Sequence, residues 1–127
     1  MTHSSSVVLL VGAADLVGQR IASAVLAAGG RVAAAVPRAW QVDKLCTALG
    51  AESGGRLLVG VVASADAEAA AGFVKGAKDA LGDITHFAGA SQLLRERVAG
   101  REPAGDFDEL LAANLISNAT LCRAVLP

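Results

Sequence analysis

Residues 7–28 read VVLLVGAADLVGQRIASAVLAA, and this stretch decides the fold of the chain. Its first five residues are apolar and largely β-branched without alternation, which predicts a short buried strand. The run stops at Gly12, and apolar residues then recur at helical spacing from near Leu16, up to a helix end at Gly29-Gly30. The stripe expected to face inward is Val17, Ile21, Val25 and Ala28. A strand, a glycine turn and a helix form the first half of a dinucleotide-binding βαβ unit.

The rest of the chain continues the alternation of strands and helices. Further strands are predicted at 31–36, 56–62 and 84–87, and further helices at 40–49, 67–81 and 107–126. Gly50 should close the second helix, and Asp106 should begin the last one as N-cap, with Glu109 at the capping-box spacing. We therefore predict one α/β domain over residues 1–127, with 1–6 as a flexible tail. It should contain a Rossmann-like parallel sheet of about four strands with helices on both faces.

Composition excludes several classes of function. The 127 residues carry 11 basic and 12 acidic side chains and only 3% aromatic residues, so the basic footprint of a nucleic-acid-binding protein is missing. No apolar run approaches the roughly 20 residues that span a bilayer. The two cysteines, Cys46 and Cys122, form no CxxC pair and predict buried free thiols in a reducing cytoplasm. No metal site is predicted, and the mixed charges of residues 95–102 are expected to form a solvated surface.

Two positions suggest a nucleotide site. The Gly12 turn follows the first strand, where open α/β sheets bind ligands, and the helix after it offers N–H groups and a partial positive charge to a pyrophosphate. Any strand–helix connection needs such a turn, so a purely structural role stays open. Arg38 follows the second strand, where an acidic residue would bind a ribose. An arginine there favours the 2′-phosphate of NADP, and the alternative is an ordinary surface arginine.

Three further polar residues call for an interpretation. Asn114 lies mid-helix on a largely apolar stripe with Leu121, so its amide must be hydrogen-bonded or solvated. Asp66 is predicted to be the N-cap of the helix at 67–81. His86 lies late in the fourth predicted strand, and a place in the core is preferred over one in the ligand crevice.

Together these segments resemble the short-chain dehydrogenase/reductase family. GAADLVG at 12–18 resembles its glycine loop, either TGxxxGxG or TGxxGxxG, and HFAG at 86–89 resembles its NNAG segment. FDELLAANLISNATLCRAVLP at 107–127 is similar to the family's fourth helix, with Asn114 on its catalytic asparagine. The resemblance covers nearly all of the chain and implies a strand order of 3-2-1-4 and an NAD(P)-dependent oxidoreductase.

The resemblance also implies which residues would contact NADP or NAD. Arg38 would meet the adenosine phosphate, and Asn114 would be the one catalytic residue present. Residues near the adenine would be Val62 and Ala63, and those near the nicotinamide-side ribose would be Ala88 and Gly89. The pyrophosphate would be held by Gly12, Ala13, Ala14, Asp15, Leu16, Val17 and Gly18.

The sequence departs from the family in three ways. The middle glycine of the loop is replaced, by Leu16 in one register or by Asp15 in the other, and an Asp15 carboxylate would repel a pyrophosphate unless it pointed to solvent. His86 and Phe87 replace both asparagines of NNAG. The family's catalytic serine, tyrosine and lysine would follow Pro127, and the chain contains no tyrosine. The chain as given is therefore expected not to run the family's reaction.

Several interpretations remain open from the sequence. The leading one is the cofactor-binding half of such an oxidoreductase, as a fragment of a longer chain or a shortened relative. The alternative is a non-catalytic Rossmann-like module that senses a nucleotide or assembles with a partner; a flavodoxin-like domain would need a fifth strand that the sequence does not contain. Because the fourth strand would be an exposed edge, we expect a homo-oligomer, or a partner chain that covers this edge and the last helix.

Overall fold

The computed structural model describes residues 6–63 and 65–127. Of the predicted tail, residues 1–5 lie outside this part. Strands and helices alternate as predicted, and the last helix is divided into three parts. The elements in chain order are β1 (Val7–Val11), α1 (Leu16–Ala27), β2 (Arg31–Val36), α2 (Ala39–Ser53), β3 (Leu57–Val61), α3 (Ala67–Leu81), β4 (His86–Gly89), α4 (Asp106–Leu111), the π-helical segment η2 (Ala112–Ile116) and α5 (Ser117–Val125).

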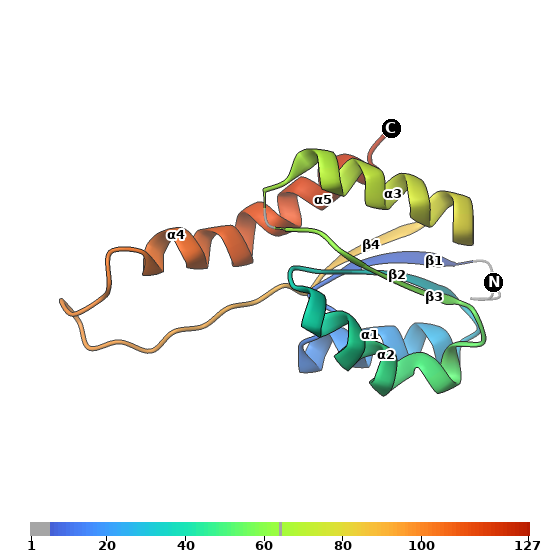
Figure 1. Ribbon diagram of the computed structural model, residues 1–127, viewed down its shortest axis with the longest axis horizontal. Coiled ribbons are helices and arrows are strands. Elements are labelled where there is room, and N and C mark those ends of the chain that lie inside the picture. Colours follow the sequence, from blue (N-terminus) through green and yellow to red (C-terminus); the bar gives the residue numbers. More distant parts are fainter. Residues whose placement is uncertain (1–5, 64) are drawn as a thin grey trace.

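The four strands form one parallel sheet in the order β3-β2-β1-β4, which confirms the predicted topology. Val7 lies opposite Arg31 of β2, and Val8 lies opposite His86 of β4. Helices α1 and α2 cover one face of the sheet, and α3 and α5 cover the other (Figure 1). Segment 90–105 and α4 extend away from these layers, beyond one end of the sheet (Figure 1). Strand β4 therefore has no neighbouring strand on its outer side among the described residues.

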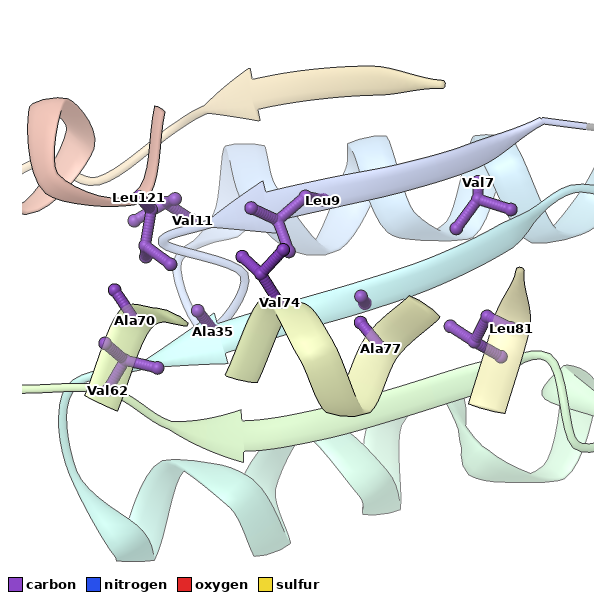
Figure 2. Close-up of a cluster of buried hydrophobic side chains, with 11 residues drawn as sticks. Val7, Leu9, Val11, Ala35, Val62, Ala70, Val74, Ala77, Leu81 and Leu121 are labelled. Carbon is purple, nitrogen blue, oxygen red and sulfur yellow. The ribbon is translucent and has the colours of Figure 1, made fainter. Parts of the chain in front are cut away.

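Two apolar layers hold the helices on the sheet. Leu9 of β1 lies beside Val74 of α3, and Val11 lies beside Leu121 of α5 (Figure 2). Val7, at the start of β1, belongs to the same buried cluster. On the other face, Leu10 of β1 belongs to a cluster with residues of α1 and α2. Every residue of β1 is buried, as the run without polar residues predicted, because the strand lies inside the sheet and has helices on both sides.

The buried stripe of α1 differs from the predicted one by one position. Gly18, Ala22 and Leu26 are the buried residues of this helix, whereas Val17 is 60% exposed. Glycine and alanine let the helix backbone approach the sheet, so the stripe of smaller side chains faces the core. Ile21 and Val25 are half-buried at the side of this face.

Three other elements also differ from the prediction, in their bounds or in their burial. Gly50 does not close α2, which continues to Ser53 and ends at Gly54 in the left-handed conformation (φ 54°). Strand β3 is half-buried rather than buried, since it is an edge strand. Strand β4 begins at His86, two residues later than expected, and His86 is exposed, so the preferred core placement was wrong.

The last helix begins one residue earlier than predicted and contains the π-helical segment η2 between α4 and α5. Gly105 is the N-cap of α4, and Asp106 is already helical, so the predicted N-cap role of Asp106 was wrong. Its carboxylate is instead 12% exposed and accepts a hydrogen bond from Arg97 at 2.9 Å. An ion pair with a residue of the preceding loop is a long-range contact that local spacing cannot indicate.

Two arginines hold helix ends against the sheet. Arg31, at the start of β2, donates to the carbonyl of Leu81 at the end of α3. Arg56, just before β3, donates to the carbonyls of Leu26 and Gly30 at 2.8 Å each, at the end of α1. A cation at a helix C-terminus satisfies carbonyl groups that have no partner within the helix.

Three other predictions concern individual side chains and the membrane. Asp66 is the N-cap of α3, where it accepts from the N–H of Ala69 at 2.9 Å, as predicted. Both cysteines are free, but Cys46 is exposed and Cys122 half-buried, so the prediction of buried thiols was wrong. Within the described part of the chain, no helix has the length and apolarity needed to cross a membrane.

Candidate functional site

A cavity of about 470 Å³ opens where β1, β2 and β4 end. This is the end of a parallel sheet at which ligands bind in open α/β folds. Its walls come from four segments: the turn after β1, the start of α2, the residues after β4, and the junction of α4 with η2. The lining residues are Gly12, Ala14, Asp15, Pro37, Arg38, Gln41, Ser91, Gln92, Leu93, Arg95, Glu109, Ala112 and Ala113.

The two glycines of the turn are required by backbone packing. Gly12 has φ +78°, and a Cβ built on it would lie 2.4 Å from the backbone nitrogen of Ser91. A Cβ on Gly18 would lie 2.1 Å from the carbonyl oxygen of Gly12. Gly12 thus permits the tight turn and the close passage of the segment after β4, and Gly18 permits the close approach of α1. These are the steric roles of the first and third glycines in dinucleotide-binding loops.

The N-terminus of α1 is available to an anion. Asp15 is its N-cap, but the Asp15 side chain accepts no hydrogen bond from the first turn. The N–H groups of that turn therefore have no capping carboxylate, which is the arrangement that binds phosphate at helix N-termini. Asp15 is exposed and lines the cavity, and the neighbouring Leu16 is 72% exposed.

Arg38 supplies a positive charge to the same cavity. Its backbone N–H donates to Oε1 of Gln41 at 3.1 Å, which fixes the start of α2. The guanidinium makes no ion pair or hydrogen bond with any residue in the described ranges, and Arg38 is exposed. A guanidinium with its donors unused can bind an anionic group in two-point geometry.

Asn114 fixes the opposite wall. Its Oδ1 accepts from the N–H of Leu93 at 2.7 Å, and its Nδ2 donates to the carbonyl of Leu93 at 2.8 Å. The amide thus pairs with one backbone residue as a neighbouring strand would. The predicted hydrogen bonding of Asn114 is confirmed, and the residue lies in η2, the kind of π-helical segment that is frequent at functional sites.

Ion pairs hold the same wall together, and two of the paired residues, Arg95 and Glu109, line the cavity themselves. Arg95 pairs with Glu109, and its Nε lies 3.8 Å from Oδ1 of Asp106. Arg97 binds Asp106 at 2.9 Å. The predicted solvated surface at 95–102 is therefore in part a set of ion pairs that join the loop to α4.

Some of the residues implied by the resemblance lie away from the cavity. Val62 is buried in the apolar layer under α3, and Ala63 is exposed. Ala88 is half-buried and Gly89 exposed, at the end of β4. Neither pair lines the cavity. Within the glycine loop, only Gly12, Ala14 and Asp15 line it, whereas Ala13, Leu16, Val17 and Gly18 do not.

Sequence reasoning missed the wall built by residues 91–95. The segment has no periodicity, so its path depends on contacts with Gly12 and Asn114 that join distant parts of the chain. The pair of N–H and carbonyl bonds to Asn114 has no local signal. Among the side chains that the structure describes, no three of His, Cys, Asp or Glu lie close enough together to hold a metal ion.

The profile of the short chain dehydrogenase family matches residues 6–127. The chain belongs to this family. The glycine turn, the strand order and the Asn114 segment thus all lie within a short-chain dehydrogenase domain. Comparison with curated protein sequences gives no match.

Solved structures of short-chain dehydrogenases have the same fold. A glucose/ribitol dehydrogenase of this family from Brucella melitensis matches with a TM-score of 0.84 and 21% identity, over 97% of this chain and 51% of its own. A short-chain dehydrogenase/reductase from Serratia marcescens matches with a TM-score of 0.81 and 21% identity, over 98% and 51%. Sorbitol-6-phosphate 2-dehydrogenase from Erwinia amylovora matches with a TM-score of 0.78 and 18% identity, over 93% and 46%. This short-chain dehydrogenase chain spans about half the length of these structures.

Proposed function

We propose that this chain is the NAD(P)-binding portion of a short-chain oxidoreductase and that its cavity holds the dinucleotide, with a preference for NADP. One observation carries the proposal: Arg38, with its free guanidinium, lines the same cavity as Asp15, the N-cap residue whose side chain leaves the first turn of α1 uncapped. The guanidinium and this first turn would bind the two anionic parts of the ligand, the 2′-phosphate and the pyrophosphate. The family match supports the cofactor class.

The residues around the cavity fit NADP in most respects. Gly12 and Gly18 bring the turn and the helix into the compact arrangement that a pyrophosphate site needs. Arg38 matches a 2′-phosphate in charge and geometry. Two carboxylates, Asp15 and Glu109, line the same cavity. Glu109 is paired with Arg95, so the exception is Asp15, whose carboxylate opposes an anion. Since Asp15 is exposed and screened by solvent, its repulsion weakens binding rather than excluding it.

The chain's own residues would bind and orient the cofactor. When bound, NADP(H) supplies the hydride that is exchanged with a substrate. The N-terminus of α1 would hold the pyrophosphate, and the wall at Leu93 would limit the cavity on the far side. Both Oδ1 and Nδ2 of Asn114 are hydrogen-bonded to the backbone of Leu93, so Asn114 acts here by positioning that wall.

A second candidate is a non-catalytic module, and the Asp15–Leu16 pair favours it. A carboxylate and an exposed leucine stand where the family's loop has glycine in one register or the other. Such a loop would keep the fold and lose tight binding of the dinucleotide. The cytoplasm as location, and self-association through the free edge of β4, remain further proposals under either candidate.

The test is a fluorescence or calorimetric titration of the purified chain with NADPH and NADH. Wild type should bind NADPH more tightly than NADH. Arg38→Ala should weaken NADPH binding about 10- to 100-fold, as expected for hydrogen bonds to a charged group, and leave NADH binding unchanged. Arg20→Ala, at an exposed position of α1 away from the cavity, is the control. Equal losses for both nucleotides would refute the role of Arg38, and no binding of either would favour the non-catalytic module.

Self-association needs a separate measurement. Analytical ultracentrifugation or light scattering should find a species larger than the 12.7 kDa chain at micromolar concentration. A substitution that places a charge on the outer side of β4 should shift the chain toward monomer, because a charged edge resists pairing. A strictly monomeric wild type would contradict this part of the proposal.

A further inference from the structure

Asn118, one turn beyond Asn114, is the unusual polar group of α5. Its Nδ2 donates to the backbone carbonyl of Asn114 at 3.1 Å. Its Oδ1 is buried and accepts no hydrogen bond from any residue of the described chain. A buried acceptor without a donor lowers the stability of a fold, so folding alone gives no reason for an amide here.

Gly89 makes room for this amide. A Cβ on Gly89 would lie 2.9 Å from Oδ1 of Asn118, so any larger residue would push the amide away. The orientation of the amide follows from its chemistry, because only the NH₂ group can donate to the carbonyl of Asn114. The oxygen must then lie over Gly89.

The carbonyl of Asn114 lies in the irregular part of the helix. In η2 the N–H of Ser117 reaches back to the carbonyl of Ala112, one residue farther than in an α-helix. The widened turn interrupts the regular ladder of backbone bonds around Asn114. The Asn118 side chain, on the following turn, donates to this carbonyl and so holds the backbone that carries the Asn114 amide.

The contacts form a series that ends at the cavity. Asn118 holds the backbone of Asn114, and Asn114 holds Leu93 by two hydrogen bonds. Leu93, Ala112 and Ala113 all line the cavity. A substitution at Asn118 can thus shift both the loop residue Leu93 and the helix residues Ala112 and Ala113, although Asn118 itself does not line the cavity.

We infer that Asn118 is a positioning residue for the cofactor cavity, which keeps Leu93 in place through the backbone carbonyl of Asn114. The consequence for nucleotide affinity rests on the proposed function, whereas the effect on Leu93 does not. Since the amide leaves an oxygen without a partner, an apolar side chain of similar size should hold the fold as well or better. An apolar replacement of Asn118 should therefore preserve or raise the stability of the fold while it loosens the position of Leu93.

The experiment measures amide hydrogen exchange at Leu93, the thermal midpoint and NADPH affinity in three variants of the chain. Asn118→Leu should speed exchange at Leu93 about three- to tenfold, the loss expected for one weakened hydrogen bond, with a midpoint equal to or above wild type. Gly89→Ala pushes the same amide from the other side and should also speed exchange at Leu93. Thr120→Val, a polar-to-apolar change on the same helix, should leave it unchanged.

A double variant tests the order of the contacts. With Asn114→Ala already present, Asn118→Leu should add no further acceleration at Leu93. Additive effects, or unchanged exchange in both Asn118→Leu and Gly89→Ala, would overturn the inference. A fall in the midpoint that matches the faster exchange would also overturn it, because that pattern indicates general loosening. Failure of wild type to bind NADPH would refute the proposed function and leave the exchange result to decide this inference.

Discussion

Gly18→Ala should destabilise the fold although it places a better helix former in α1. The Cβ would lie 2.1 Å from the carbonyl oxygen of Gly12 and 2.7 Å from Cα of Ala13. Both atoms are backbone, so no side chain can move aside to relieve the contact. The helix must shift by most of an ångström, away from the turn that forms the proposed pyrophosphate site.

The expected change in the free energy of unfolding of Gly18→Ala is the difference between two opposing contributions. Overpacking of this kind costs about 1–3 kcal/mol. The gain in helix propensity is at most about 1 kcal/mol, and less in the first turn of a helix. The net loss in the free energy of unfolding should therefore be about 1–2 kcal/mol. For a chain of this size that corresponds to a drop of roughly 3–8 °C in the thermal midpoint.

Gly50→Ala is the matched control. Gly50 lies inside α2, and a Cβ there would meet no described atom within 4 Å beyond its chain neighbours and the backbone of its own helix. The same substitution should therefore raise the free energy of unfolding by about 0.5–1 kcal/mol. Urea unfolding followed by circular dichroism measures both variants. If Gly18→Ala were as stable as Gly50→Ala, the close approach of α1 to the Gly12 turn would be refuted.

Three more predictions concern stability and exposure. Arg56→Met should lower the free energy of unfolding by about 1–2 kcal/mol, because it removes both hydrogen bonds to carbonyls at the end of α1, and denaturant unfolding measures the loss. Asp66→Ala should cost about 1 kcal/mol in the same assay and Asp66→Ser only a few tenths, since serine also caps helices. Cys46 should react with an aromatic disulfide reagent in the native state, and Cys122 should react more slowly; equal rates would contradict their different exposure.

The sequence predicted the sheet well because the decisive signals are local. Uniform apolar runs mark β1 and β2, whose bounds were predicted to the residue. The capping residue Asp66 marks the start of α3 in the same way. Gly50 misled because a glycine at an exposed helical position is only a weak breaker, and α2 continues past it to Ser53.

The site was predicted less well because half of it depends on long-range contacts. Gly12 and Arg38 lie next to strand ends, so the strand pattern places them correctly. Residues 91–95 enter the cavity only because Gly12 leaves room for Ser91 and Asn114 holds Leu93. Neither contact can be derived from spacing along the chain.

The structure separates what the glycine loop does for folding from what it does for binding. Gly12 and Gly18 are required by backbone contacts within the protein, so their presence indicates the fold with or without a ligand. The middle glycine of such loops serves the approach of a pyrophosphate, and the protein itself does not need it. Leu16 can therefore stand there, 72% exposed, in a well-formed turn. If this division is correct, Leu16→Gly or Asp15→Gly should change nucleotide affinity far more than it changes the unfolding midpoint.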